Sequence, residues 1–170
     1  MTQFKMTTPQ IIDALVARFG SSIQQVPAID HPRVHVAPAD WPQIAAWLRN
    51  EPAIQLDWLR CLTGIDYAAD GQLAVAYELM SFTHRHDLAV KVYVSRDNPV
   101  IVSVAHLWPA ANWHEREAFD LLGIVFEGHP NLQRILLADD WAGHPLRKDY
   151  EFPRSYHGIP GSVELDWVQK

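Results

Sequence analysis

The middle of the chain contains two neighbouring segments in which apolar side chains recur at every second position, residues 73–82 and 88–94. Successive side chains of a β-strand point to opposite faces, so this alternation predicts paired strands with one buried face. Another apolar run at 56–65 precedes them, and Asp70-Gly71, a dipeptide that favours tight hairpin turns, lies between. The chain is therefore expected to fold around a largely antiparallel sheet.

Helical patterns flank these strands on both sides. Residues 9–20 and 38–50 carry apolar side chains at helical spacing, and a third helix is expected at 109–122. Two short strand candidates, 22–26 and 33–36, separate the first two helices. This order of elements predicts an α+β fold, a two-layer domain in which helices pack a largely antiparallel or mixed sheet.

The last part of the chain has a different composition. After Gly123, glycine and proline recur and no periodic apolar run survives between them, although tryptophan, leucine and isoleucine are still present. A long segment without regular structure is uncommon inside a compact domain. We therefore expect an α+β core domain at 1–127 and an extended C-terminal arm at 128–170 whose apolar side chains bind a partner. Packing of the arm against its own domain is the alternative.

Composition argues against several functions. With 48% hydrophobic and 20% charged residues the chain is globular, and its formal net charge of −6 argues against binding nucleic acid, which requires clustered lysine and arginine. The single cysteine, Cys61, cannot form an internal disulfide or hold an iron–sulfur cluster. Glycine-rich fingerprints for dinucleotides or phosphates are absent as well. The sequence therefore predicts that this chain binds no cofactor.

Targeting signals are also missing from the sequence. No stretch approaches the ~20 apolar residues that a membrane-spanning helix needs, and the first residues lack a signal-peptide pattern. We expect a soluble, cytoplasmic chain that reaches a membrane only through another protein.

Residues 112–123 form a segment with its own physical signature. Asn112 is expected to cap the helix, with Glu115 completing a capping box, and Gly123 is expected to end it in the left-handed conformation. His129 and His144, each in a Gly-His-Pro turn, lack the spacing of a zinc site. A stand-alone histidine- or metal-dependent enzyme is kept as an alternative.

A longer ordered pattern runs from this helix to Tyr150. Its members are Glu115, Arg116, Glu117, Asp120, Gly123, Gly128, His129, Pro130, Arg134, Trp141, Gly143, His144, Pro145, Arg147, Lys148, Asp149 and Tyr150. This pattern resembles the C subunit of the proton-pumping NADH–quinone oxidoreductase, respiratory complex I. One departure is Gln133, which stands where that family usually has a basic residue. We take the seventeen positions as the family signature and as a partner interface.

The resemblance implies a core subunit of the peripheral arm of that translocase, at the cytoplasmic face of the inner membrane. It implies no catalytic, cofactor-binding or metal-binding residue in this chain, so flavin, iron–sulfur clusters and quinone would lie on partner subunits. The arm would dock against the large quinone-site subunit and neighbouring subunits of the peripheral arm. Because Arg134 and Arg147 stand among apolar arm residues, we expect them to be paired in the partner's groove if the arm docks in one. The chain would thus support electron transfer from NADH to quinone coupled to proton translocation. An equivalent subunit of a related membrane-bound nickel–iron hydrogenase is the second alternative.

Overall fold

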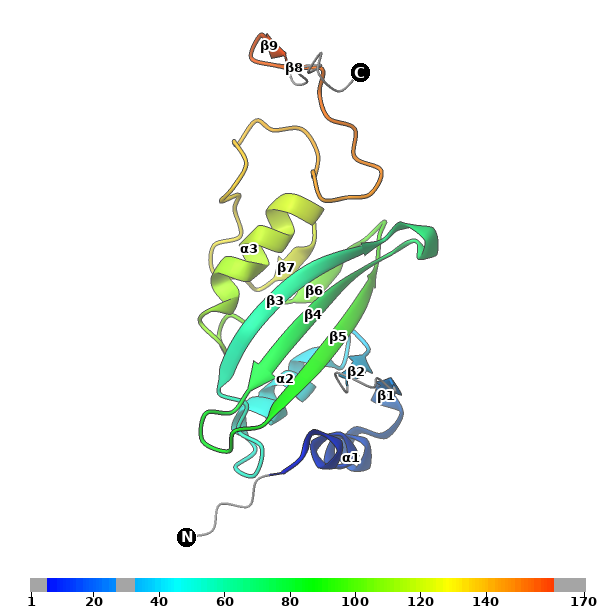
Figure 1. Cartoon of the computed structure of the whole chain (residues 1–170), viewed down its shortest axis with the longest axis vertical. Helices are drawn as coiled ribbons and strands as arrows, with labels where there is room; N and C mark the ends of the chain where they lie inside the picture. The colour runs from blue at the N-terminus through cyan, green and yellow to red at the C-terminus, as the bar shows by residue number, and fades with distance from the viewer. Residues whose placement is uncertain (1–5, 27–32, 161–170) are drawn as a thin grey trace, which may run out of the picture.

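The computed structural model describes residues 6–26 and 33–160 of the 170-residue chain. Residues 161–170 of the predicted arm lie outside this range. Over the described residues the predicted order of helices and strands is present (Figure 1). The elements are α1 (Thr8–Phe19), β1 (Ile23–Val26), β2 (Arg33–Val36), α2 (Trp41–Asn50), β3 (Trp58–Tyr67), β4 (Gln72–Met80), β5 (Asp87–Ser95), β6 (Val100–Val102), α3 (Ala111–Leu122), β7 (Val125–Glu127), β8 (Ser155–Tyr156) and β9 (Ile159–Pro160).

Five strands form one mixed sheet in the order β1-β2-β5-β4-β3. Strands β3, β4 and β5 are antiparallel neighbours, β1 pairs antiparallel with β2, and β2 runs parallel to β5. The register sets Tyr77 opposite Val90 and Val75 opposite Val92. The apolar positions of β4 and β5 therefore share one face of the sheet, so the alternating pattern buries the apolar side chains of both strands together. The predicted α+β fold with a largely antiparallel, mixed sheet is confirmed.

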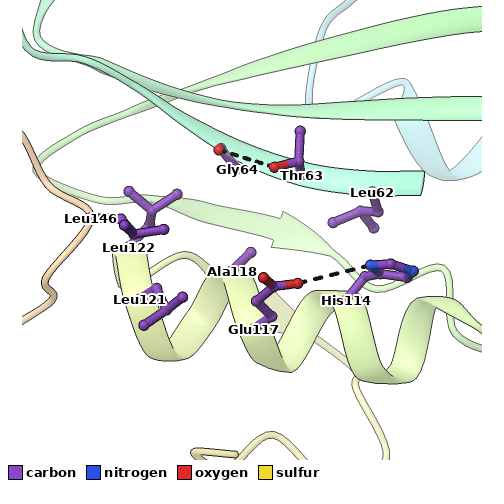
Figure 2. A pocket seen from close by; sticks show the side chains of 9 residues that line it. All are labelled: Leu62, Thr63, Gly64, His114, Glu117, Ala118, Leu121, Leu122 and Leu146. Atoms are coloured by element: carbon purple, nitrogen blue, oxygen red, sulfur yellow. Dashed lines mark hydrogen bonds and ion pairs between the residues drawn. The ribbon is translucent and has the colours of Figure 1, made fainter. Parts of the chain in front are cut away.

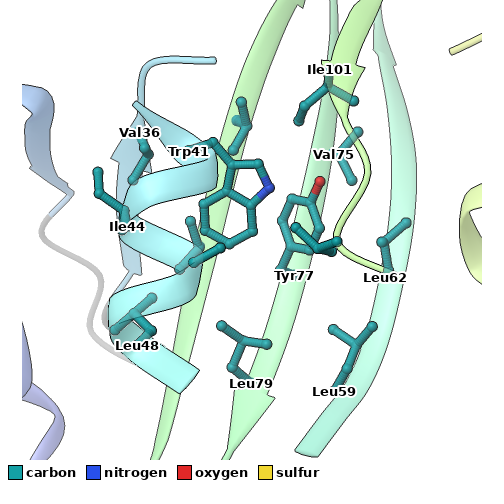
Figure 3. Close-up of a cluster of buried hydrophobic side chains, with 14 of the residues drawn as sticks. Val36, Trp41, Ile44, Leu48, Leu59, Leu62, Val75, Tyr77, Leu79 and Ile101 are labelled. Atoms are coloured by element: carbon teal, nitrogen blue, oxygen red, sulfur yellow. The ribbon is translucent and has the colours of Figure 1, made fainter. Parts of the chain in front are cut away.

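Helix α2 covers the apolar face of this sheet. Its Trp41 ring packs against the ring of Tyr77, with the ring centroids 4.4 Å apart and both side chains fully buried. Figure 3 shows Trp41 pointing toward Tyr77 of β4, with Leu79 and Leu59 farther along the same side of the sheet. Burial of such side chains stabilises the fold by about 1.5–3 kcal/mol each. In Figure 1, α2 lies behind the sheet and no described helix lies in front of β3, β4 and β5.

Helix α3 packs against β3 at one edge of the sheet, and the parallel pair β6 and β7 lies beside it (Figure 1). The closest approach falls at Gly64, where Leu122 of α3 occupies the space in which a side chain would stand. A residue without a Cβ therefore lets the helix that carries the first signature residues sit tightly on the sheet.

Gly64→Ala is expected to destabilise the chain. An added Cβ would overlap Leu122 and lie 3.2 Å from Ile124 Cδ1, so both side chains would have to shift, at a cost of about 1–3 kcal/mol in free energy of unfolding. Urea denaturation of the purified chain measures this cost. Thr63→Ala, at the exposed neighbouring position, is the control and should change the free energy by less than about 0.5 kcal/mol. Equal effects of the two substitutions would contradict the close packing at Gly64.

Candidate functional site

Helix α3 carries the first signature residues, and its two ends differ in how well the sequence predicted them. The helix begins at Ala111, with Ala110 at the N-cap position and no side-chain cap. Asn112 therefore lies inside the first turn, and the predicted capping box of Asn112 and Glu115 is wrong. The physical reason is that Glu115 turns into the protein and is completely buried. The predicted end is confirmed, because Gly123 adopts φ 74° in the left-handed region.

Glu115 is a buried carboxyl that joins α3 to the segment after β6. Its Oε2 accepts a hydrogen bond from Ser103 Oγ at 2.6 Å, and its Oε1 accepts one from the Val104 backbone N–H at 2.8 Å. Burial raises the pKa of Glu115 to about 7, although both hydrogen bonds favour the ionised form. Glu115 therefore titrates near neutral pH, unlike an exposed glutamate.

His129 lies beside this carboxyl, with its Nε2 atom 3.9 Å from Glu115 Oε2 and its side chain fully buried. Its Nδ1 accepts a hydrogen bond from the Asn131 backbone N–H at 3.0 Å, so the proton is assigned to Nε2, which is 3.1 Å from the Asn112 carbonyl oxygen. Both ring nitrogens are thus used to hold the turn after β7 against the start of α3.

Arg116 points from α3 toward the segment that follows β7. It donates hydrogen bonds to the carbonyl oxygens of Gln133 at 3.0 Å and Arg134 at 3.2 Å, and its guanidinium lies 5.2 Å from the Trp113 ring centroid. The departure at Gln133 leaves this contact intact, because Arg116 binds the backbone at that position rather than the side chain.

Asp120 binds the same segment more extensively. Its Oδ2 accepts hydrogen bonds from the backbone N–H groups of Ile135, Leu136 and Leu137 at 3.0, 2.8 and 2.9 Å, and its Oδ1 lies 3.0 Å from Arg134 Nη1. Burial opposes ionisation of Asp120, but the three N–H groups and Arg134 outweigh it and hold the pKa below its usual range. The carboxylate is therefore charged whenever the chain is folded at neutral pH.

The Gly-His-Pro-Leu-Arg part of the signature supplies hydrogen-bond donors for carbonyl groups in the last turn of α3. A helix leaves these carbonyls without intrahelical partners. Here Gly123 N binds Phe119 O at 2.9 Å, and the others are bound by the arm: His144 Nδ1 lies 2.9 Å from Asp120 O, Leu146 N 3.0 Å from Leu121 O, and Arg147 Nε 2.7 Å from Leu122 O. The Arg147 charge also suits the negative end of the helix dipole.

Gly123 is needed for this arrangement as well as for the turn. A Cβ added at Gly123 would lie 2.5 Å from His144 Nε2 and 3.0 Å from Arg147 Nη2. The apolar neighbours of Arg134 and Arg147 predicted that both bind in a partner's groove; in the structure both contact the chain's own helix. A partner contact by either one stays a prediction.

Aromatic residues order the next part of the arm. Trp141 Nε1 donates a hydrogen bond to Tyr150 Oη at 2.9 Å, and Tyr150 Oη donates one to the Ala142 carbonyl oxygen at 3.1 Å. Gly143, with φ 80°, lies under the Tyr150 ring, where an added Cβ would come within 2.8 Å of Cε2. These contacts bring three signature residues together.

Asp66 and Arg96 belong to the site although the sequence reasoning missed them. Arg96 Nε donates to Asp66 Oδ1 at 3.0 Å and the guanidinium also forms an ion pair with Asp149, while Lys148 N donates to Asp66 Oδ2 at 2.8 Å. Burial opposes ionisation of Asp66, yet Arg96 and the Lys148 N–H hold its pKa below the usual value. The available signal was an acidic residue at the end of the apolar run that forms β3.

The remaining signature residues are not brought together. The side chain of Glu117 is half-exposed and lies 4.0 Å from His114, and Lys148 takes part through its backbone while the residue as a whole is exposed. Gly128 and Pro130 shape the turn around His129, with φ 78° at Gly128, and Pro145 follows His144 in the segment that binds the end of α3.

Several large apolar side chains of α3 and the arm are exposed. Those of Trp113, Leu136, Leu146, Phe152 and Ile159 are 56–68% exposed. Figure 2 shows a shallow pocket between β3 and α3 in which Leu121 and Leu146 lie below Gly64 and Thr63. Four of the five belong to the arm, and exposed apolar surface of this kind is typical of protein interfaces.

The chemistry available at this site is hydrogen bonding and charge pairing. Among the described residues, no three His, Cys, Asp or Glu side chains form a group that could hold a metal ion. The polar side chains of the signature instead bind backbone groups, as Arg116, Asp120 and Arg147 do. The geometry thus defines an α+β domain with a long segment fastened along its third helix.

The chain belongs to the family described as respiratory-chain NADH dehydrogenase, 30 Kd subunit, whose sequence pattern matches residues 34–156. This span contains every signature position. The matching relatives are named as the C subunit of NADH-quinone oxidoreductase. The one from Chlorobium phaeobacteroides is 41% identical over 162 residues, covering 94% of this chain and 98% of the relative. The one from Chloroherpeton thalassium is 52% identical over 120 residues, so the match covers 70% of this chain but only 50% of that relative's length.

Solved structures share the fold. Nqo5, solved as a trypsin-resistant fragment, matches with a TM-score of 0.62 and 28% identity, covering 73% of this chain and 98% of the fragment. A chain of the membrane-bound sulfane sulfur reductase, described as an archaeal respiratory membrane complex, matches with a TM-score of 0.65 and 19% identity over 95% of this chain and 88% of that chain. The second likeness shows the fold alone. None of the described helices is both long and apolar enough to cross a membrane.

Asp120→Asn is expected to lower the free energy of unfolding by about 3 kcal/mol, because it removes the counter-charge of Arg134 and weakens three backbone hydrogen bonds at a buried position. Urea denaturation at neutral pH measures the loss. Glu117→Gln removes the same charge from the same helix at a half-exposed position and should change stability by less than about 0.5 kcal/mol. A loss no larger than that of the control would show that Asp120 does not hold the arm.

Glu115 should make stability fall as the pH rises. The folded chain binds the proton with a pKa of about 7 instead of 4.5, so its extra stability is complete below about pH 4.5 and is lost as the pH rises through 7. In Glu115→Gln the amide stays neutral, so its stability relative to the wild type should increase by up to about 3 kcal/mol between about pH 5 and pH 8. Denaturation curves across this range measure the difference, which a pH-independent offset would contradict.

Proposed function

We propose that this chain is a cofactor-free core subunit of the peripheral arm of an NADH–quinone oxidoreductase. In that assembly it supports the quinone-reducing module in electron transfer from NADH to quinone, coupled to proton translocation. The family match and the relatives named as the C subunit of NADH-quinone oxidoreductase support this proposal. The same names favour it over the equivalent subunit of a nickel–iron hydrogenase.

The observation that carries the proposal is the contrast, within residues 128–160, between polar groups that are bound inside this chain and apolar side chains that are exposed. Many of their polar contacts are made with the chain's own core, as at Asp120 and Arg147, and others, such as Trp141 with Tyr150, lie within the arm. Leu136, Leu146 and Phe152 nevertheless remain more than half exposed. Ordering exposed apolar side chains costs conformational entropy that only burial can offset. A segment held rigid with its apolar side outward is therefore suited to bind another protein.

We propose the large quinone-site subunit as the partner of this surface, together with neighbouring subunits of the peripheral arm. The chain would then lie at the cytoplasmic face of the inner membrane and be attached to it through the complex. Flavin, iron–sulfur clusters and quinone would be held by these partners.

The direct test is purification of the affinity-tagged chain from membranes of its native host. We expect it to co-purify with flavin- and iron–sulfur-containing subunits and with NADH–quinone activity, whereas the chain expressed alone should contain neither flavin nor stoichiometric metal. Co-purification with nickel-containing subunits would support the hydrogenase alternative. Flavin, an iron–sulfur absorbance band or tightly bound zinc with turnover in the isolated chain would contradict the proposal.

Leu146→Ser is expected to weaken assembly without unfolding the chain. Leu146 is 56% exposed at the pocket between β3 and α3, so the free chain's melting temperature should hardly change, whereas loss of a buried interface anchor costs about 1–2 kcal/mol or more and roughly tenfold in affinity. The amount of chain recovered in the membrane complex measures the effect. Phe82→Ser, at a 58% exposed position on the far hairpin, is the control. Equal incorporation of both variants would place the interface elsewhere.

A further inference from the structure

The face of the five-stranded sheet opposite α2 has a hollow that the arm and α3 do not use. In Figure 1 this is the face of β3, β4 and β5 turned toward the viewer, and no described helix covers it. The hollow has a volume of about 230 Å³ and is lined by Arg33, Ile65, Ala76, Glu78, Ala89, Val90 and Lys91. Ala76 of β4 and Ala89 of β5 supply the small side chains of this lining.

Two cations stand at this hollow, Lys91 on β5 and Arg33 on the neighbouring strand β2. The register pairs Lys91 with His35 and Arg33 with Ala89, so the two cations are diagonal neighbours across the β2–β5 pair. Lys91 is fixed in place, because its Nζ donates a hydrogen bond to Tyr67 Oη at 2.8 Å and lies 5.4 Å from the Tyr67 ring centroid.

The positive charge lowers the pKa values of two neighbouring groups, His35 and Tyr67. Burial lowers the pKa of His35, and Lys91 and Arg33 lower it further, while the hydrogen bond from Lys91 lowers the pKa of Tyr67. The one acidic residue among those lining the hollow is Glu78, and it forms no ion pair with either cation in the described structure. A chain with a formal net charge of −6 thus presents a local cationic surface.

We propose that this cationic hollow, lined by Arg33 and Lys91, binds an acidic segment of a neighbouring subunit, one carboxylate of which pairs with Lys91. The inference rests on the proposed function, since it requires a multisubunit assembly, and it adds a second contact surface on the sheet face opposite α2. Charge complementarity of this kind sets the orientation of partners and excludes wrong ones.

Zero-length cross-linking with a carbodiimide tests the pairing, because this reagent joins a lysine amine to a carboxylate only when the two are in contact. The probe is the purified membrane complex, and the cross-linked peptides are identified by mass spectrometry. We expect an amide between Lys91 and an aspartate or glutamate of another subunit. Lys91→Arg, which keeps the charge but cannot form the amide, should abolish this cross-link.

Charge reversal supplies the second measurement. Lys91→Glu should reduce incorporation into the complex several-fold, whereas Arg60→Glu, the same charge reversal at a half-exposed position on β3, should not. If Lys91→Glu does not fold, the cross-link and its loss in Lys91→Arg decide the question. Two kinds of result would overturn the inference but not the proposed function. One is a cross-link from Lys91 only to Glu78, to a second copy of this chain or to a lipid. The other is no reaction of Lys91 in an intact complex. Absence of the chain from the complex would overturn both.

Discussion

The buried carboxylate of Asp120 is the contact on which the arm after β7 depends. Residues 128–154 contain no described strand or helix, so their backbone groups cannot satisfy one another in a regular ladder. Asp120 accepts three consecutive backbone N–H groups and pairs with Arg134. This arrangement offsets the cost of burying the charge and fixes where the arm begins its path along α3.

Glu115 and Asp120 show how the surroundings decide what a carboxyl group does. Both are fully buried on the same helix. Glu115 receives one hydroxyl and one N–H, so burial dominates and its pKa rises to about 7. Asp120 receives three N–H groups and a guanidinium, so its pKa falls despite burial. The helix therefore holds a permanent charge toward the arm and a group that titrates near neutral pH toward the segment after β6.

Local patterns in the sequence predicted most of the fold. Alternation predicted β4 and β5, and Asp70-Gly71 predicted the turn before β4, where Gly71 has φ 63°. The capping box failed because Asn112 and Glu115 have the right spacing for a cap, yet Glu115 finds better partners in Ser103 and Val104. Spacing alone cannot show that a buried alternative competes with a local hydrogen bond. The division into a core and a partner-binding arm stays a prediction.

The sequence by itself determined the strands of the five-stranded sheet, the three helices, the left-handed end of α3 at Gly123 and the set of residues that mark the family. Only the tertiary structure decided what those residues contact. Asp120 binds Ile135, 15 residues away, and Asp66 binds Lys148, 82 residues away. Local periodicity cannot predict such pairs, because they form only when the folded sheet brings the ends of β3, β5 and α3 close to the arm.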